Sequence, residues 1–200
     1  MTMVDVIRHY DLLIDEGNDP VHDPMELRAY MDKWDGAAFQ RALALDGSQS
    51  VLEIGVGTGR LAMRIAPECR SYTGIDVSPK TIVRAKENLA QLSNVALCCC
   101  DFLAGEINAS FDVICATLTF MHIADKVTAV RRIAALLTPG GRVVISLDKN
   151  QAEYIDYGSR CVRVYPDDPK QMEALMQAAG LTVLPGIETE FAHIIVAERR

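Results

Sequence analysis

The chain has 200 residues and a mass of 22.0 kDa, half of its residues are hydrophobic, and its formal net charge is −7. A negative charge without a basic run argues against binding to a nucleic-acid backbone, and no segment approaches the roughly 18 apolar residues of a membrane span. The length suits one compact domain, residues 1–15 lack the features of a secretory signal, and we therefore expect a cytoplasmic protein that acts on a small molecule.

Residues 1–47 differ in pattern from the rest of the chain. Apolar side chains recur at helical spacing over 6–14 and again over 27–39, and the polar turn Gly17–Pro20 lies between the two stretches. The spacing predicts helices that cap the carboxyl edge of a sheet formed by the residues that follow. We treat this segment as an N-terminal helical lid.

A buried strand, a glycine turn and a helix are predicted in succession from residue 51. Residues 51–55 are apolar except for Glu53, glycines follow at alternate positions, and helical spacing continues over 59–66. Glycine has no Cβ, so the backbone of such a turn can approach a ligand closely and deliver it to a helix N-terminus. The pattern predicts a nucleotide-shaped pocket.

Short apolar runs alternate with longer helical patterns up to residue 147, which predicts a parallel sheet with crossover helices. Ser78 and Pro79 suit the start of a helix, and Thr138–Gly141 suits a helix end. The expected strands are 51–55, 72–76, 95–100, 111–116 and 141–147, and the expected helices are 59–66, 79–91 and 123–137.

Six cysteines include the run Cys98–Cys100. Consecutive side chains on a strand point to opposite faces, so these three thiols cannot surround one ion. We interpret them as small residues of a buried, reduced strand, and we predict no metal site.

The pattern changes after residue 148. We expect residues 150–165 to be an insertion packed over the pocket mouth, with a strand over 161–165. A helix follows from Pro169 to about residue 179, and strands over 181–187 and 190–197 complete the chain as an antiparallel pair.

The turn Glu53-x-Gly55-x-Gly57-x-Gly59 resembles motif I of the class I S-adenosylmethionine-dependent methyltransferases. The resemblance covers roughly residues 50–147. It implies an α/β, Rossmann-like, seven-stranded and mostly parallel sheet with an antiparallel C-terminal hairpin and helices on both faces. It also divides the chain into the lid, 1–47, and a methyltransferase domain, 48–200.

The resemblance implies that S-adenosylmethionine is the cofactor. Asp76 ends the second strand, where a carboxylate can bind both ribose hydroxyls, and Asp101 would receive the adenine amino group with Phe102 against the ring. Acidic Glu53 suits a cationic ligand, and Thr117 and Leu118 would lie beside the methionine portion and its methyl group. The full set of expected cofactor residues is Glu53, Gly55, Gly57, Gly59, Asp76, Val77, Asp101, Phe102, Thr117 and Leu118.

His122 is the candidate catalytic residue, because a neutral imidazole can accept a proton from a hydroxyl or amine nucleophile. A structural role for His122 in capping the third helix stays open. The segment Ala116–Thr119 lacks the Asn/Asp-Pro-Pro-aromatic tetrapeptide of one branch of amino-group and nucleic-acid methyltransferases. In the family a helical lid commonly contributes to the substrate chamber, for which the candidates are Tyr10, His22, Tyr30, Trp34 and Tyr154.

The sequence therefore predicts methyl transfer from S-adenosylmethionine to an unidentified small molecule. One alternative is an NAD(P)-dependent oxidoreductase, although a dinucleotide turn requires glycine at its sixth position, where this chain has Arg60. A second alternative is a subunit that binds S-adenosylmethionine without turnover. The patterns indicate neither the acceptor nor an oligomeric state.

Overall fold

The computed structural model describes residues 2–200 and is built around one eight-stranded sheet in the order β10-β11-β6-β5-β2-β3-β4, with β9 also paired to β11. The strands from β4 through β6 are mutually parallel, whereas β11 is antiparallel to its neighbours. The strand bounds are β2 (Ser50–Ile54), β3 (Ser71–Asp76), β4 (Val95–Cys99), β5 (Phe111–Thr117), β6 (Leu137–Asp148), β9 (Leu181–Val183), β10 (Ile187–Glu188) and β11 (Ala192–Arg199).

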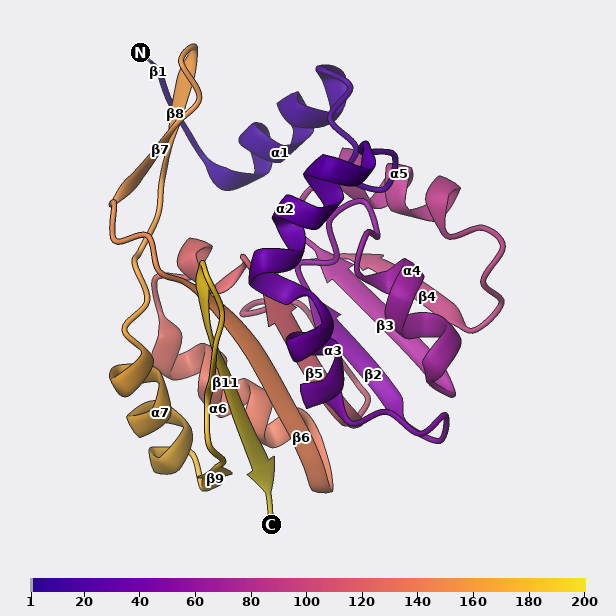
Figure 1. Ribbon diagram of the computed structural model, residues 1–200, viewed down its shortest axis with the longest axis vertical. Coiled ribbons are helices and arrows are strands. Elements are labelled where there is room, and N and C mark those ends of the chain that lie inside the picture. The colour runs from indigo at the N-terminus through magenta and orange to yellow at the C-terminus, as the bar shows by residue number, and fades with distance from the viewer. Residues whose placement is uncertain (1) are drawn as a thin grey trace.

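Helices cover both faces of this sheet (Figure 1). One hydrophobic core packs α6 (Lys126–Leu136) and α7 (Pro169–Ala178) on one face. The other core packs α3 (Ala37–Leu43), α4 (Ala62–Ile65) and α5 (Pro79–Asn88) on the opposite face. The Rossmann-like fold predicted from the sequence is confirmed.

Strand β2 shows why the apolar runs form central strands. Val51 packs in the core under α3 and α4, whereas Leu52 and Ile54 pack in the core under α6 and α7, and all three are almost fully buried. A parallel strand between two helical layers must be apolar on both faces, which explains the continuous run. The buried carboxyl of Glu53 is the exception in this strand.

Two predicted helices begin or end elsewhere than expected. The helix predicted over 59–66 is a short α4, and a 3-10 turn, η1 (Ala66–Glu68), follows it at Pro67. The helix predicted over 123–137 begins at Lys126, after a 3-10 turn, η2 (Phe120–His122). Asp125 caps that helix by accepting from the backbone N–H of Thr128, so the capping role considered for His122 is wrong.

Strand boundaries also differ at the carboxyl-terminal half of the sheet. Strand β6 begins at Leu137, four residues before the predicted start. Leu137 pairs with Phe111 of β5 and Arg142 pairs with Val113, so the residues between Leu137 and Arg142 form a bulge within the strand. The predicted strand 181–187 is interrupted between β9 and β10, where Pro185 and Gly186 lie. Both pieces pair with β11, so the antiparallel C-terminal arrangement is confirmed with one strand divided into two.

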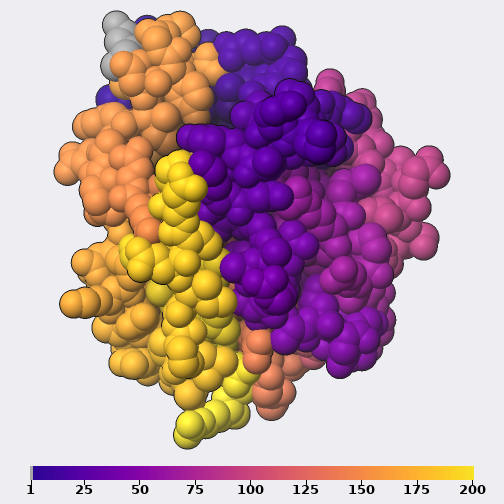
Figure 2. Space-filling view, viewed as in Figure 1, coloured from indigo at the N-terminus to yellow at the C-terminus, as the bar shows by residue number. Residues whose placement is uncertain are grey.

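The N-terminal segment forms α1 (Val6–Asp15), α2 (Met25–Asp35) and α3 rather than two helices. Gly36 separates α2 from α3: its ψ is −150°, and a Cβ there would lie 2.5 Å from the backbone oxygen of Asp32. In Figure 2 this segment lies across the visible face, between the orange hairpin and the magenta side of the sheet.

The insertion is a hairpin of β7 (Tyr154–Asp156) and β8 (Arg160–Arg163), and an unpredicted strand β1 (Thr2–Val4) runs parallel to β8 (Figure 1). Arg160 joins this small sheet to α1. Its Nε donates to Nδ1 of His9 at 3.0 Å, and its Nη1 and Nη2 bind the Glu16 carboxylate at 2.6 and 2.8 Å.

Cys98 and Cys99 are exposed, because β4 is the edge of the sheet, so the expectation that the cysteine run is buried is wrong for these two residues. Within residues 2–200 no group of three or more His, Cys, Asp or Glu side chains could hold a metal ion. No helix in the described part of the chain is both long enough and apolar enough to span a bilayer.

Candidate functional site

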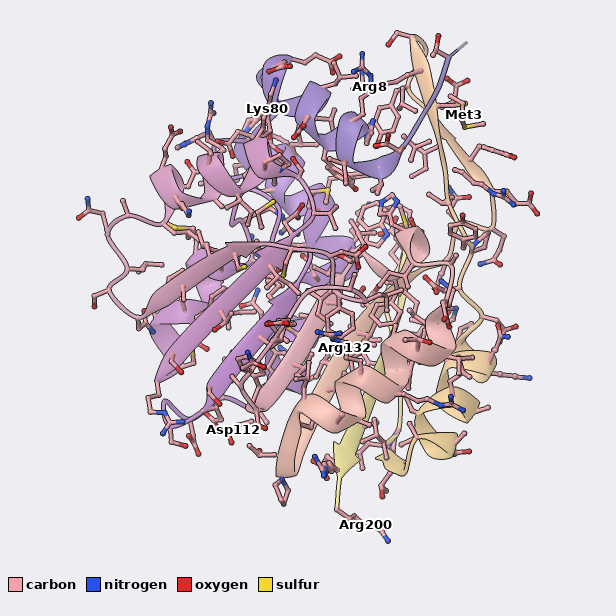
Figure 3. All side chains as sticks on the ribbon, turned by 180° about the vertical axis from the view of Figure 1, so that it is seen from behind. Met3, Arg8, Lys80, Asp112, Arg132 and Arg200 are labelled. Atoms are coloured by element: carbon pink, nitrogen blue, oxygen red, sulfur yellow. The ribbon has the colours of Figure 1, made fainter. Side chains whose placement is uncertain are left out.

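A cavity of about 640 Å³ lies at the carboxyl ends of β2, β3 and β5, under α1 and α2. The chain passes from β2 outward to β4 on one side and from β5 to β6 on the other, so the cavity lies where the strand order reverses. Open α/β sheets bind ligands at this position. The start of β5 is at the far end: Figure 3 shows Asp112 at the lower end of the sheet and Lys80 near the upper end.

The glycine turn after β2 forms the floor of the cavity. Gly55 has a φ of +78°, and a Cβ there would lie 2.1 Å from Oγ1 of Thr119, so no other residue fits without displacement. Gly59 has a φ of +99°, but its missing Cβ faces the side chain of Leu89, and Gly59 does not line the cavity. Gly59 therefore permits close packing of the turn against the residue that follows α5.

Asp76 lies at the end of β3, in the cavity wall beside Val77. Its Oδ2 accepts from the backbone N–H of Gly57 at 3.0 Å and its Oδ1 from that of Ser78 at 2.9 Å. Burial raises the pKa of the Asp76 carboxyl, while these backbone donors act in the opposite direction. The carboxyl thus joins the glycine turn to the start of α5.

Asp101 and Phe102 follow β4 and line the neighbouring part of the cavity. Oδ1 of Asp101 accepts from the backbone N–H of Leu103 at 2.6 Å, which fixes the carboxylate at the turn. The guanidinium of Arg132 lies 5.5 Å from the centre of the Phe102 ring.

Three buried ionisable groups meet beside the glycine turn, and sequence reasoning identified only Glu53 as part of the site. Asp35, from α2, is fully buried, pairs with Arg60 and accepts from Oγ1 of Thr117 at 3.0 Å. Burial raises the pKa of the Glu53 carboxyl well above its usual range, and the charge of Asp35 adds to the shift.

Each of these three groups has one buried polar atom without a hydrogen-bond partner within residues 2–200: Oδ1 of Asp35, Oε2 of Glu53 and Nη1 of Arg60. Buried polar atoms are ordinarily paired, so this group of unsatisfied atoms is unusual, although Nη1 of Arg60 lies 3.8 Å from Oδ1 of Asp32. Arg60 entered the sequence analysis only as a departure from the dinucleotide motif. No local signal marks Asp35, because the fold of the lid brings it to β2.

A tyrosine and a histidine form a pair at the opposite wall. The hydroxyl of Tyr10, on α1, lies 2.9 Å from Nε2 of His122, on η2. Burial lowers the pKa of His122 to about 4, with the charges of His9 and Lys126 acting in the same direction, so the imidazole is neutral near pH 7. Burial raises the pKa of the Tyr10 phenol, which therefore keeps its proton.

Leu118 lines the cavity with a φ of +52°, a left-handed conformation that is uncommon for a residue with a side chain. Backbone strain of this kind concentrates at functional sites. Of the ten expected cofactor residues, the structure places nine on this cavity and leaves out only Gly59.

Four of the five expected chamber residues lie outside the cavity. His22 is exposed and lies 3.2 Å from Oδ1 of Asn88. Tyr30 and Trp34 lie on one face of α2 and pack against Phe191. The other face of α2 lines the cavity with Leu27, Met31 and Asp35. Tyr154 is exposed on the hairpin, and Tyr157, at the hairpin turn, lines the cavity instead.

Residues 52–143 match a family model described as a methyltransferase domain. The matched region runs from β2 into β6 and includes the glycine turn, Asp76, Asp101 and His122. The matched part of the chain therefore resembles a methyltransferase domain.

Curated relatives also carry methyltransferase names. An uncharacterized methyltransferase of Mycobacterium tuberculosis (strain ATCC 25618 / H37Rv) is 33% identical over 100 residues, which are 50% of this chain and 50% of the relative. One from Bacillus cereus (strain 03BB102) is 35% identical over 99 residues, which are 48% of this chain and 46% of the relative. The chain spans about half the length of the curated relatives it matches.

Solved structures of the same fold cover almost the whole chain. The N-methyltransferase NodS from Bradyrhizobium japonicum WM9, in complex with S-adenosyl-L-homocysteine, has a TM-score of 0.72 at 20% identity and covers 96% of this chain and 97% of its own. Magnesium protoporphyrin IX methyltransferase from Synechocystis PCC 6803, with bound S-adenosylmethionine, has a TM-score of 0.75 at 15% identity and covers 98% of this chain and 95% of its own.

The [4+2]-cyclase SpnF has a TM-score of 0.76 at 18% identity and covers 100% of this chain and 98% of its own. At these identities the likeness shows a shared fold. Because a cyclase shares the methyltransferase fold, the reaction must be argued from the site.

Proposed function

We propose that the chain binds S-adenosylmethionine and transfers its methyl group to a small molecule. The observation that carries this proposal is the group of Glu53, Asp35 and Arg60 beside the glycine turn, each with a buried polar atom that makes no hydrogen bond within residues 2–200. Two carboxyl groups and a guanidinium suit the ammonium and carboxylate of an amino acid, which is one end of S-adenosylmethionine. Asp76 and Asp101 line the same cavity, at the ends of the neighbouring strands β3 and β4.

We assign the residues to the parts of this ligand by their positions on the strands. Asp76 and Val77 hold the ribose, Asp101 and Phe102 hold the adenine, and the backbone of Gly55 and Gly57 approaches the centre of the ligand. Glu53, Asp35 and Arg60 hold the amino-acid end, beside Thr117 and Leu118. Gly59 supports the turn without contacting the ligand.

The alternative dinucleotide ligand fits the charges poorly. A pyrophosphate requires backbone donors or cations at the helix N-terminus. Here α4 is one turn long, and the carboxyl groups of Asp35 and Glu53 lie beside the glycine turn, where they offer a pyrophosphate no positive charge. Within residues 2–200 the one Lys or Arg side chain that lines the cavity is Arg60, which already pairs with Asp35.

We further propose that His122 and Tyr10 remove the proton of the methyl acceptor. S-adenosylmethionine, when bound, supplies an electrophilic methyl group on a sulfonium sulfur. In the tautomer that carries its proton on Nδ1, His122 accepts from the Tyr10 hydroxyl at Nε2, and the oxygen of Tyr10 is then free to accept from the acceptor molecule.

The proposal extends to the organisation of the chain. Residues 1–47 act as the lid, since α1 and α2 supply Tyr10 and Asp35 to the cavity, and residues 48–200 form the methyltransferase domain. A cytoplasmic location is supported by six free cysteines, two of them exposed, which suit a reducing compartment.

Calorimetry with S-adenosylhomocysteine and with NADH tests the ligand. We expect heat of binding from S-adenosylhomocysteine and none from NADH, and the reverse would overturn the proposal. Glu53→Gln should weaken S-adenosylhomocysteine at least tenfold and leave 5′-methylthioadenosine unchanged, because the latter lacks the amino-acid end.

Transfer is tested separately from binding. Purified protein is incubated with methyl-tritiated S-adenosylmethionine and a metabolite extract, and we expect tritium in an extractable product. Tight binding with no labelled product would favour the subunit that holds the cofactor without turnover.

A further inference from the structure

The part of the cavity beside Tyr10 and His122 is mostly apolar. Its other lining side chains come from α1, α2, η2 and the hairpin turn, and they are Val6, Leu13, Leu27, Met31, Ile123 and Tyr157. An apolar wall favours a ligand whose surface is largely apolar, and its few polar groups fix the orientation of that ligand. The polar groups of these residues are the hydroxyls of Tyr10 and Tyr157 and the imidazole of His122, of which Tyr10 and His122 contact each other.

The charges around the cavity are unfavourable to an anionic acceptor. Among residues 2–200 its lining includes a single Lys or Arg side chain, Arg60, and six acids: Asp23, Asp35, Glu53, Asp76, Asp101 and Asp125. Arg60 is already paired with Asp35, and Asp23 forms no ion pair within the described chain. A carboxylate or phosphate on the acceptor would be desolvated without a counter-charge.

The Tyr10–His122 pair also limits which atom of the acceptor can be methylated. A hydroxyl oxygen that gains a methyl group becomes an oxonium, which is a far stronger acid than an imidazolium, so even a weakly basic imidazole removes its proton. An ammonium must lose a proton before it can react, and an imidazole whose pKa burial lowers to about 4 cannot remove it at neutral pH.

We infer that the methyl acceptor is an apolar molecule without an anionic group that receives the methyl on a hydroxyl oxygen at the Tyr10–His122 pair. This inference rests on the proposed function. The bond from the hydroxyl oxygen to the methyl carbon forms as the carbon–sulfur bond breaks, and the electron pair of the broken bond stays on sulfur. The hydroxyl proton passes to the oxygen of Tyr10 as Tyr10 gives its own proton to Nε2 of His122.

The test compares three probes that share a 4-butylphenyl group and differ in the polar substituent: 4-butylphenol, 4-butylbenzoate and 4-butylbenzylamine, which are neutral, anionic and cationic at pH 7.5. Each is titrated calorimetrically into protein saturated with S-adenosylhomocysteine, and each is assayed for tritium transfer from S-adenosylmethionine. We expect the phenol to bind at least tenfold more tightly than the benzoate, and we expect the phenol alone to become methylated. Equal or tighter binding of the benzoate, methylation of the amine, or no binding of the phenol would overturn the inference.

Two substitutions of Met31, one charged and one neutral, test the argument from charge. Met31→Lys places a cation in the apolar wall and should raise benzoate affinity at least tenfold, whereas Met31→Gln should not, provided that both variants unfold cooperatively. Unchanged benzoate affinity in Met31→Lys would contradict the argument from charge. Failure of S-adenosylhomocysteine itself to bind would instead refute the proposed function, so the two failures are distinguishable.

Discussion

The hydroxyl of Tyr10 lies 2.9 Å from Nε2 of His122, although 112 positions separate the two residues in the chain. One comes from the first helix and the other from the short turn after β5. Their ring planes are nearly perpendicular, at 87°, with the ring centres 5.5 Å apart. The contact therefore joins the lid to the sheet at the place where an acceptor would react.

Tyr10→Phe should lower kcat for methyl transfer roughly 100-fold, because positioned proton transfer contributes at least that factor. The affinity for S-adenosylhomocysteine should stay unchanged, since the phenol is assigned to the acceptor and not to the cofactor. Single-turnover transfer and calorimetry measure the two quantities. A fall in cofactor affinity with an unchanged single-turnover rate would show that Tyr10 acts on the lid alone.

His122→Gln should change how stability depends on pH. The usual histidine pKa of 6.5 falls to about 4 in the folded protein, so the unfolded chain takes up a proton at a higher pH than the native one. The resulting stability is present above pH 6.5 and is lost as the pH falls toward 4, by about 2 kcal/mol between pH 7.5 and 5.0.

Urea unfolding of wild type and His122→Gln at pH 7.5 and 5.0 measures that difference. Other titrating groups, including His9, contribute to both proteins and cancel in the comparison. If the free energy of unfolding fell by the same amount between pH 7.5 and 5.0 in wild type and in His122→Gln, the pKa of the His122 imidazole would be the same in the folded and unfolded protein.

Asp35→Asn should destabilise the protein by about 3 kcal/mol, because it leaves the buried guanidinium of Arg60 without its charged partner. Asp32→Asn is the comparison: Asp32 is one turn earlier on α2 and partly exposed, pairs with Arg64 at 2.6 Å and lies 3.8 Å from Nη1 of Arg60, so this substitution removes only the weaker contact to that guanidinium. Asp32→Asn should lower the free energy of unfolding by about 1 kcal/mol or less. Equal free energies of unfolding for the two variants would refute a special role for the Asp35–Arg60 pair.

Asp76→Asn should weaken S-adenosylhomocysteine roughly 10- to 100-fold, the value of one or two charge-assisted hydrogen bonds. Asp76→Ala should in addition lower the free energy of unfolding by about 2 kcal/mol, because the backbone N–H groups of Gly57 and Ser78 lose their acceptor. Calorimetry and urea unfolding separate the two effects. Unchanged affinity in Asp76→Asn would show that the ribose lies elsewhere.

The local pattern of the chain was sufficient to predict the sheet and most of the residues that line one side of the cavity. The apolar runs around Val51 and Phe111 are buried on both faces, and the carboxyl ends of parallel strands meet at one edge. Once those strands were recognised, Asp76 and Asp101 had to lie at that edge. The ends of strands and helices were predicted less well, since Pro185 interrupts a strand through turn geometry and Asp125 begins a helix through capping rather than through hydrophobic period.

The sequence by itself determined the layered α/β core and the acids that line its edge, because both follow from local hydrophobic period and the direction of the strands. Only the tertiary structure decided which lid side chains enter the cavity. Trp34 and Tyr30 are as aromatic as Tyr10, but one face of α2 packs on Phe191 and the other brings Asp35 to Arg60. That choice depends on how distant helices pack, which no local spacing specifies.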